Sequence, residues 1–422
     1  MHEFRYLRNN LFCERVKVED LAKRWGTPLY VYSYKTLLDH YWKLKNAFRE
    51  INPLICYSVK ANSNLSILKI LVEQGAGLDI VSGGELFRAI KVKCPPKRIV
   101  YASVGKTERE IETAIRQGIL FFNVESVSEL ENINRIAERL GKKTNVSLRI
   151  NPDVEPQTHR FITTGKLTNK FGLDFQTAEE ILKKREKYLW LKIKGLHIHI
   201  GSQIIESSPF VSAIRKLVSF HRQMKEEGID LEYLNIGGGL GIIYYKEKPQ
   251  TAKEFALCVI PILKETQAKV ILEPGRFIAG PSGILVVKVL YIKSTPSKNF
   301  IIVDGAMNDL IRPALYGAYH EILPVTKFQN QKSKIKNQKY DIVGPICESG
   351  DFFAKDREIS PLREGDYLAI MGAGAYGFSM SSNYNSRCRV AEVLVKDDKA
   401  YLIRKRETYR DLVRNEVVID KF

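Results

Sequence analysis

The sequence predicts an α/β protein in which a (β/α)8 barrel of the TIM type is followed by a mostly antiparallel, barrel-like β domain. Strand-like apolar runs alternate with helical patterns from about residue 54 to about residue 280, as parallel βα units do. There are about eight such units over about 230 residues, which matches the size of this kind of barrel. After Pro281, strand patterns follow one another without helices between them.

The alternating region can be followed along the chain. Strands are expected at 54–59, 77–81, 98–102, 119–124, 144–150, 194–200, 231–236 and 269–272. Helices are expected at 63–73, 84–92, 107–117, 126–140, 177–187, 209–227 and 252–266. A doubly wound open sheet would alternate in the same way. Polar residues at the carboxyl ends of the strands favour the barrel, because all eight ends then converge on one face.

The two ends of the chain show a different organisation. The N-terminal part contains a helix at 18–25, a strand at 27–32 and a helix at 34–49. The C-terminal part contains strands at 284–292, 300–303, 340–343, 366–371, 389–395 and 400–403. We therefore divide the chain into 1–33, which packs with the β domain, the barrel at 34–280, and the β domain at 281–422. The lysine-rich stretch 327–339 is expected to be an exposed hairpin excursion.

Composition and charge argue against a nucleic-acid-binding, secreted or membrane-spanning protein. The net charge is +18, but the lysines are spread along the chain without interleaved aromatic residues, which indicates a solvated basic surface rather than a nucleic-acid interface. The six cysteines lack paired spacing, so reduced thiols are expected. The N-terminus does not resemble a signal peptide, and no apolar run reaches the ~18 residues of a membrane span. These features predict a cytoplasmic protein that contacts neither membrane nor nucleic acid.

A lysine follows the first strand of the barrel. The run 53–59 has the pattern of a buried strand, and Lys60 comes directly after it, before Ala61 and Asn62. Burial lowers the pKa of an amine, and a lowered pKa also prepares the amine to form a Schiff base with a carbonyl. A surface lysine at the start of a loop is the structural alternative.

Three further strand ends carry groups suited to a phosphorylated heterocycle. The glycines at 237–239 follow the seventh strand, where barrels commonly bind phosphate, although they could also form a tight turn. Glu273 ends the eighth strand, and it could pair with Arg276 or hold a proton on a ring nitrogen. His197 and His199 alternate on the sixth strand. We expect one to face the lumen and the other the helix layer, which argues against a shared metal ion.

A Schiff-base lysine, a glycine cradle, a carboxylate and a flat imidazole on one rim describe a pyridoxal phosphate site. Further motifs follow in a characteristic order: 57–62 (YSVKAN), 79–86 (DIVSGGEL), 195–203 (GLHIHIGSQ), 237–239 (GGG), 273–276 (EPGR), 312–316 (RPALY), 347–351 (CESGD) and 374–376 (GAY). The sequence resembles the diaminopimelate decarboxylase family. This family is one of the barrel-type pyridoxal phosphate decarboxylases, which include ornithine decarboxylase and share their fold with alanine racemase.

The resemblance implies a role for each matched residue. Lys60 would form the Schiff base, His199 would stack on the pyridine ring, and Glu273 would bond the ring nitrogen, with Asp79 also in the cofactor site. The phosphate would be held by Ser202, Gly238, Gly239, Gly275 and Arg276, with Tyr376 beside it. The distal end of the substrate would be bound by Arg276, Arg312, Tyr316, Glu348 and Tyr376, with Glu348 taking the distal ammonium.

Two further assignments follow from the same resemblance. Cys347, supplied by the second subunit of a homodimer, would donate a proton to the carbon that loses carbon dioxide. A small core residue is the structural alternative for this cysteine. The stretch 159–172 resembles the mobile lid of the family, and its glycine and threonine content fits a loop that closes, although a purely structural loop would look similar.

The implied reaction is the decarboxylation of meso-2,6-diaminopimelate to L-lysine and carbon dioxide, the last step of lysine biosynthesis. Two arginines suit bidentate recognition of a distal carboxylate. The alternatives are a decarboxylase of the same fold acting on ornithine, arginine, carboxynorspermidine or a carrier-bound glutamyl group, and a cofactor-binding regulator that has lost catalysis. No metal is expected.

Overall fold

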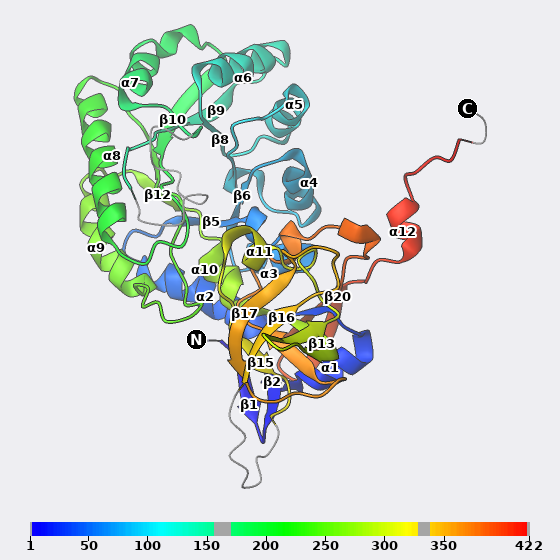
Figure 1. The fold of residues 1–422 in the computed structure, drawn as a ribbon. Coiled ribbons are helices and arrows are strands. Elements are labelled where there is room, and N and C mark those ends of the chain that lie inside the picture. Colours follow the sequence, from blue (N-terminus) through cyan, green and yellow to red (C-terminus); the bar gives the residue numbers. More distant parts are fainter. Residues whose placement is uncertain (1, 156–169, 328–337, 420–422) are drawn as a thin grey trace. The chain divides into compact units, whose positions relative to one another are not determined.

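The computed structural model describes residues 2–155, 170–327 and 338–419. The chain divides into two compact units. One unit comprises His40–Ile243 and Glu247–Ile278, and the other comprises Met1–Asp39, Tyr244–Lys246 and Ala279–Phe422. Each unit is described separately below, and Figure 1 labels the elements of both.

The first unit contains a closed barrel of eight parallel strands, in the spatial order β10-β11-β12-β5-β6-β7-β8-β9. The strands, in chain order, are β5 (Leu54–Ser58), β6 (Gly77–Ile80), β7 (Ile99–Tyr101), β8 (Phe121–Val124), β9 (Thr144–Arg149), β10 (Leu191–His197), β11 (Tyr233–Asn235) and β12 (Lys269–Leu272). The ring closes where β12 pairs with β5. The predicted barrel is thereby confirmed, and the open-sheet alternative is wrong.

Helices follow the strands and lie outside the barrel (Figure 1). They are α3 (Leu65–Glu73), α4 (Gly83–Lys91), α5 (Glu108–Gln117), α6 (Val127–Arg139), α7 (Phe175–Lys183), α8 (Ser208–Glu226) and α9 (Ala252–Lys264). Helix α2 (Tyr34–Ala47) precedes the first barrel strand. Several begin where a small polar side chain accepts a backbone N–H: Ser82, Thr107, Ser126 and Thr251 cap α4, α5, α6 and α9. Capping therefore fixes where the loops before these four helices end.

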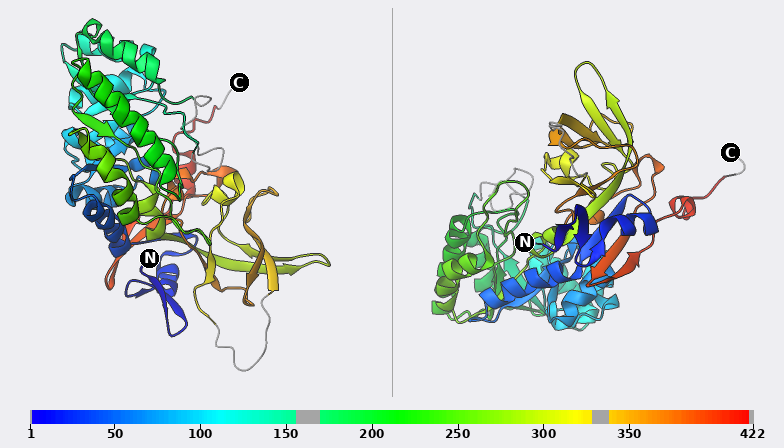
Figure 2. Two further views of the ribbon diagram at one scale, coloured as in Figure 1. Left: turned by 90° about the vertical axis from the view of Figure 1, so that its left-hand side faces the viewer. Right: turned by 90° about the horizontal axis from the view of Figure 1, so that it is seen from below.

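The second unit is built on a nine-stranded sheet that includes a strand from the N-terminal part of the chain. Strand β4 (Leu29–Ser33) lies between β13 (Gly283–Ser294) and β19 (Ala391–Lys396). The other strands are β14 (Asn299–Val303), β15 (Ile322–Pro324), β16 (Gln338–Val343), β17 (Phe352–Ile359), β18 (Tyr367–Ile370) and β20 (Lys399–Arg404). Figure 2 shows these strands from two other sides. Most pairs are antiparallel, as predicted, and the two parallel pairs are β4 with β19 and β14 with β16.

An apolar cluster holds this sheet against the N-terminal segment. It contains Leu29 and Val31 of β4, Ile284 and Val286 of β13, and Val393 of β19, all fully buried. Helix α1 (Val18–Trp25) and the small hairpin sheet of β1 (Phe4–Leu7), β2 (Asn10–Cys13) and β3 (Val16–Lys17) add to the same cluster. Burial of these side chains stabilises the attachment of the N-terminal strand at ~25 cal/mol per Å² of apolar surface.

Several elements of this unit do not appear in the sequence prediction. Strand β17 has a charged centre, Lys355 to Glu358, which interrupts the apolar alternation, and its partner β16 carries register shifts opposite it. The short strands β1, β2, β3 and β15 are also additional. Most of the lysine-rich stretch 327–339, and the greater part of the expected lid at 159–172, lie outside the residues that the structure describes.

Within the described ranges, no helix is long and apolar enough to cross a membrane.

Candidate active site

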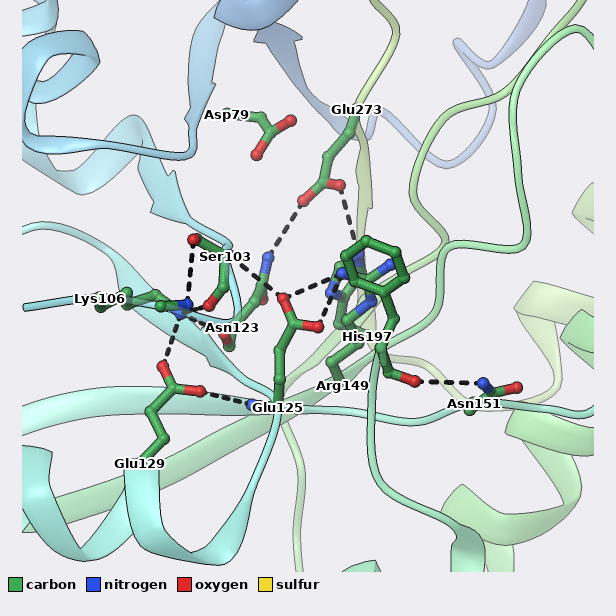
Figure 3. A network of polar contacts seen from close by, with 12 residues as sticks. Asp79, Ser103, Lys106, Asn123, Glu125, Glu129, Arg149, Asn151, His197 and Glu273 are labelled. Carbon is green, nitrogen blue, oxygen red and sulfur yellow. Dashed lines mark hydrogen bonds and ion pairs between the residues drawn. The ribbon is translucent and has the colours of Figure 1, made fainter. Parts of the chain in front are cut away.

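Polar side chains stand at the carboxyl ends of seven barrel strands. Lys60 lies in the short helix Val59–Ala61, directly after β5, and Asp79 lies on β6. On the remaining strands the corresponding residues are Asn123 on β8, Arg149 at the end of β9, His197 at the end of β10, Asn235 at the end of β11 and Glu273 directly after β12. Figure 3 shows several of them gathered around the carboxylate of Glu273. The sequence therefore places its chemistry on one face of the barrel.

The buried carboxylate of Glu273 is held by three side chains. Its Oε1 accepts hydrogen bonds from Nδ2 of Asn235, at 2.6 Å, and from Nδ2 of Asn123, at 3.2 Å. Its Oε2 lies 3.2 Å from Nε2 of His197, which is also buried. Burial raises the pKa of Glu273, but the facing imidazole and the amide of Asn235 outweigh it, so the pKa lies well below its usual value. Glu273 is thus ionised and fixed in orientation.

A second buried carboxyl group, that of Asp79, lies on the same rim. Its Oδ2 accepts a 2.5 Å hydrogen bond from Oγ of Ser58 and lies 4.0 Å from Nζ of Lys60. Burial and then the negative charge of Glu273 raise the pKa of Asp79 to about 8, against the opposite effect of Lys60. The amine of Lys60 is partly exposed, with 39% of its side chain accessible. It therefore lies beside Asp79 at the rim and is accessible to a ligand.

The two histidines of the sixth strand do not face opposite layers. Strand β10 ends at His197, and His199 lies in the loop beyond it, where strict alternation no longer applies. Burial, and then the positive charges of Lys60 and Arg149, lower the pKa of His199, and Glu273 acts on it from the other direction. Both rings are therefore in the electrostatic field of the barrel mouth. The expectation that one of them faces the helix layer is wrong.

The tautomer of His199 follows from its partner. The backbone N–H of Gly238 donates to Nδ1 of His199 over 3.2 Å. Because the lowered pKa keeps the ring neutral, its proton is on Nε2. The glycine loop after β11 and the histidine loop after β10 therefore fix one another.

The glycine loop approaches its neighbours too closely for any side chain. A Cβ on Gly238 would lie 2.1 Å from the carbonyl oxygen of Glu273, and one on Gly239 would lie 2.4 Å from that of Gly201. Gly239 also has a φ of +112°. Nearby, Arg276 donates from Nε and Nη2 to Oγ of Ser202, at 3.3 and 3.2 Å. Close backbone approach, a hydroxyl group and a guanidinium are the parts of a phosphate cradle.

A second layer of polar contacts supports the rim (Figure 3). The fully buried ammonium of Lys106 donates to Oε1 of Glu129 at 2.6 Å, to the carbonyl of Ser103 at 2.8 Å and to that of Asn123 at 2.9 Å. The other oxygen of Glu129 accepts the backbone N–H of Glu125. Lys106 thus fixes Asn123, whose side-chain amide donates a hydrogen bond to Glu273.

The carboxylate of Glu125 continues this layer toward Arg149. Both of its oxygens lie 3.0 Å from Nη1 of Arg149, and Oε1 also accepts the backbone N–H of Ser103. The sequence reasoning gave Lys106, Glu125 and Glu129 no role. Their only signal was a charged residue next to a strand end, which is common on protein surfaces.

The remaining predicted site residues belong to the unit that contains the β domain, and their surroundings within that unit are as follows. Arg312 is buried at the start of α11 (Arg312–Tyr316), and Tyr316 is partly buried at its end. Cys347 is exposed, with its backbone N–H donating to Oδ1 of Asn385. Glu348 is also exposed and accepts a 2.8 Å hydrogen bond from the hydroxyl of Tyr384.

Tyr376 completes the set in this unit. It is partly buried and has a left-handed backbone, with a φ of +56°. A non-glycine residue in this conformation is uncommon, and such residues are concentrated at ligand sites and turns. Lys60, Asp79, His199, Ser202, Gly238, Gly239, Glu273, Gly275 and Arg276 all belong to the barrel unit, where Gly275 directly precedes the short helix α10 (Arg276–Ala279).

Comparison with known proteins identifies the barrel. Residues 35–280 match the family model described as the pyridoxal binding domain of pyridoxal-dependent decarboxylases. A diaminopimelate decarboxylase of Aquifex aeolicus is 50% identical over 97% of this chain and 96% of its own length. One from Haemophilus influenzae is 47% identical over 98% of both chains.

Solved structures agree along nearly the whole chain. Diaminopimelate decarboxylase from Helicobacter pylori, in complex with L-lysine, superimposes with a TM-score of 0.90 at 42% identity, covering 94% of this chain and 99% of the other. The enzyme from M. jannaschii, also in complex with L-lysine, has a TM-score of 0.93 at 39% identity, covering 99% of both.

The residues present fit pyridoxal phosphate. The glycine cradle leaves no room for a Cβ, so only backbone can line it. An ionised, buried carboxylate at Glu273 matches a protonated ring nitrogen, and the open amine of Lys60 lies on the same rim. Anion-binding groups, a carboxylate partner for the heterocycle and a Schiff-base amine are thus all supplied by one unit.

Proposed function

This chain belongs to the diaminopimelate decarboxylase family of pyridoxal-phosphate-dependent enzymes, and we propose that it converts meso-2,6-diaminopimelate to L-lysine and carbon dioxide. The observation that carries the cofactor chemistry is the ionised carboxylate of Glu273, buried among Asn123, Asn235 and His197 on the rim that also bears Lys60. The similarity to relatives along 97–98% of the chain supports the substrate.

The barrel residues hold and tune the cofactor. Pyridoxal phosphate, when bound, supplies an electron-withdrawing ring that stabilises the negative charge left on carbon as carbon dioxide departs. Lys60 would hold the cofactor through Nζ, the atom that is accessible at the rim. Glu273 would keep a proton on the ring nitrogen, because its carboxylate is ionised at neutral pH. His199, fixed as the Nε2–H tautomer, would lie against the ring.

The phosphate and the distal end of the substrate are held by two sets of groups that share Arg276. Ser202, Arg276 and the backbone of Gly238, Gly239 and Gly275 hold the phosphate, with Tyr376 beside it. Arg312, Tyr316 and Arg276 bind the distal carboxylate of the substrate, and Glu348 binds its distal ammonium. Bidentate arginine contacts favour a substrate with a carboxylate at its far end over ornithine or arginine.

The protonation step requires an acid at the reacting carbon. We assign this step to the thiol of Cys347, supplied by a second copy of the chain in a homodimer. The exposure of Cys347 and Glu348 in a single chain supports a site that a second copy completes. Mixing the inactive variants Lys60→Ala and Cys347→Ala should restore about a quarter of wild-type activity, because half of the dimers are then mixed and each mixed dimer carries one intact site of its two. No recovery after verified subunit exchange would contradict the shared site.

A panel of substrates tests the choice of substrate. Carbon dioxide release would be measured for the loaded enzyme with meso-diaminopimelate, ornithine, arginine, carboxynorspermidine and a carrier-bound glutamyl group. Only diaminopimelate should be turned over efficiently, with lysine as the product. Equal rates with ornithine would contradict the assignment. The cytoplasmic location is a prediction from the sequence that cell fractionation would check.

A further inference from the structure

The guanidinium of Arg312 is held by two neutral groups. Its Nη1 lies 2.8 Å from Nε2 of His320, and its Cζ lies 4.6 Å from the centre of the ring of Tyr244. The rings of Tyr244 and His320 meet edge to face at 5.3 Å. All three residues belong to the same unit, because Tyr244–Lys246 packs with it. Neither contact cancels the positive charge of Arg312.

The partners of His320 determine its tautomer. Its Nδ1 lies 2.7 Å from the carbonyl oxygen of Met371, which can only accept, so Nδ1 carries the proton. A guanidinium can only donate, so Nε2 of His320 must accept from Arg312. The imidazole is therefore neutral and protonated on Nδ1. A second proton would place two donors face to face and remove the hydrogen bond to Arg312.

Contacts at the backbone hold His320 in place. His320 precedes β15 and Met371 follows β18, and these two strands pair antiparallel, so their register brings the two residues together. The carbonyl of His320 accepts a 2.9 Å hydrogen bond from Nη1 of Arg357, whose Cζ lies 4.0 Å from the ring centre of Tyr319. His320 is fully buried. Because His320 is held by the paired strands, it fixes the position of the Arg312 guanidinium relative to the sheet.

We propose that His320 is a specificity-determining positioning residue, which holds Arg312 in place for a carboxylate at the distal end of the substrate. The inference rests on the proposed function, which gives Arg312 its ligand. A carboxylate at position 320 would orient the guanidinium equally well, but it would neutralise the charge. A neutral acceptor orients the guanidinium and adds no negative charge of its own beside it. The ligand class is therefore an amino acid with a second carboxylate.

Three substitutions of His320 distinguish the effect of the acceptor atom Nε2 from the effect of the size of the ring. His320→Gln keeps an acceptor near the place of Nε2, His320→Asn keeps only a donor near Nδ1, and His320→Phe keeps the shape alone. KM for meso-diaminopimelate should rise about tenfold or more in the Asn and Phe variants, a loss typical of an outer partner of a binding side chain. KM should rise less in the Gln variant. The kcat value and the visible spectrum of the bound cofactor should stay unchanged, because the lost contact acts on binding.

A second measurement does not depend on turnover. Nitrogen-15 NMR of histidine-labelled protein, with the signal of His320 assigned by its loss in His320→Gln, should show a protonated Nδ1 and an unprotonated Nε2 at neutral pH. Either the opposite tautomer or a doubly protonated ring would overturn the proposal.

The outcomes of the kinetic test are distinguishable. In an active wild-type background, an unchanged KM in both the Asn and Phe variants would overturn the role of His320 alone. A loss of kcat with unchanged KM would do the same, because it would indicate a role in chemistry. Absence of turnover by the loaded wild-type enzyme would contradict the proposed function and, with it, the ligand of Arg312.

Discussion

The carboxyl groups of Asp79 and Glu273 are buried on one rim of the barrel, and their pKa values move in opposite directions. The pKa of Glu273 lies well below its usual value because His197 faces it, whereas burial and the charge of Glu273 raise the pKa of Asp79 to about 8. Like charges in one site are rarely both ionised. The barrel mouth thus keeps one ionised carboxylate, at Glu273, and one protonated acid, at Asp79.

Replacement of Asp79 by Asn should alter how stability depends on pH. In the folded protein this acid holds its proton up to about pH 8, while in the unfolded chain it loses it above about pH 4. The folded state therefore binds more protons between these values, and stability from this group falls as pH rises. In cofactor-free protein, the free energy of unfolding should therefore fall less steeply with pH in Asp79→Asn than in wild type. The difference in slope should be up to about 1.4 kcal/mol per pH unit.

Denaturant unfolding of the cofactor-free protein at pH 5, 6, 7 and 8 measures this slope. The exposed Asp230, replaced by Asn, controls for the general loss of a carboxyl group. The same slope in wild type and Asp79→Asn would show that Asp79 is not a protonated acid in the folded protein.

Replacement of Gly238 by Ala should weaken binding of pyridoxal phosphate. The new Cβ would lie 2.1 Å from the carbonyl oxygen of Glu273, so the loop must move. A displacement of about 1 Å at a binding loop costs on the order of 100-fold in function. Gly105→Ala is the matched control, because nothing lies within 4 Å of its Cβ position. Equilibrium dialysis with pyridoxal phosphate measures both variants, and equal affinities would contradict the cradle.

Replacement of Lys106 by Met should both destabilise the barrel and loosen Glu273. Loss of one partner from a buried ion pair costs about 3–5 kcal/mol, because Glu129 is left with an uncompensated charge. The carbonyl of Asn123 also loses a donor, so the amide that holds Glu273 is no longer fixed. Lys194, which forms a partly exposed ion pair with Glu232, is the control, and Lys194→Met should cost less than about 1 kcal/mol.

Two measurements separate the effects of Lys106→Met. Denaturant unfolding gives the loss of stability. Affinity for pyridoxal phosphate, measured well below the unfolding midpoint, reports the position of Glu273 and should fall. A variant that is destabilised but binds the cofactor as tightly as wild type would restrict Lys106 to a structural role.

The barrel could be predicted because its signal is local and repeated. Each strand is a short buried apolar run, and residues such as Asp79 and Asn123 follow from their place at the strand ends. Strand β17 was missed because its centre, Lys355 to Glu358, is charged and exposed, so its pairing depends on β16 and not on its own pattern.

The contacts that orient the site were harder to predict. Lys106, Glu129 and Glu125 are ordinary charged residues in the sequence, and their burial arises from packing between neighbouring βα units. His320 likewise gives no signal, because its role depends on the register of β15 against β18. Sequence reasoning also extended β10 too far, and this led to the wrong expectation that one of its two histidines faces the helix layer.

Carbon dioxide release from meso-diaminopimelate by protein loaded with pyridoxal phosphate tests the central claim most directly. Wild-type protein should release one equivalent of carbon dioxide for each lysine formed. Lys60→Ala, verified as folded, should lose both the visible absorbance of the cofactor Schiff base and the activity. Protein that carries the cofactor but releases no carbon dioxide from meso-diaminopimelate would contradict the account.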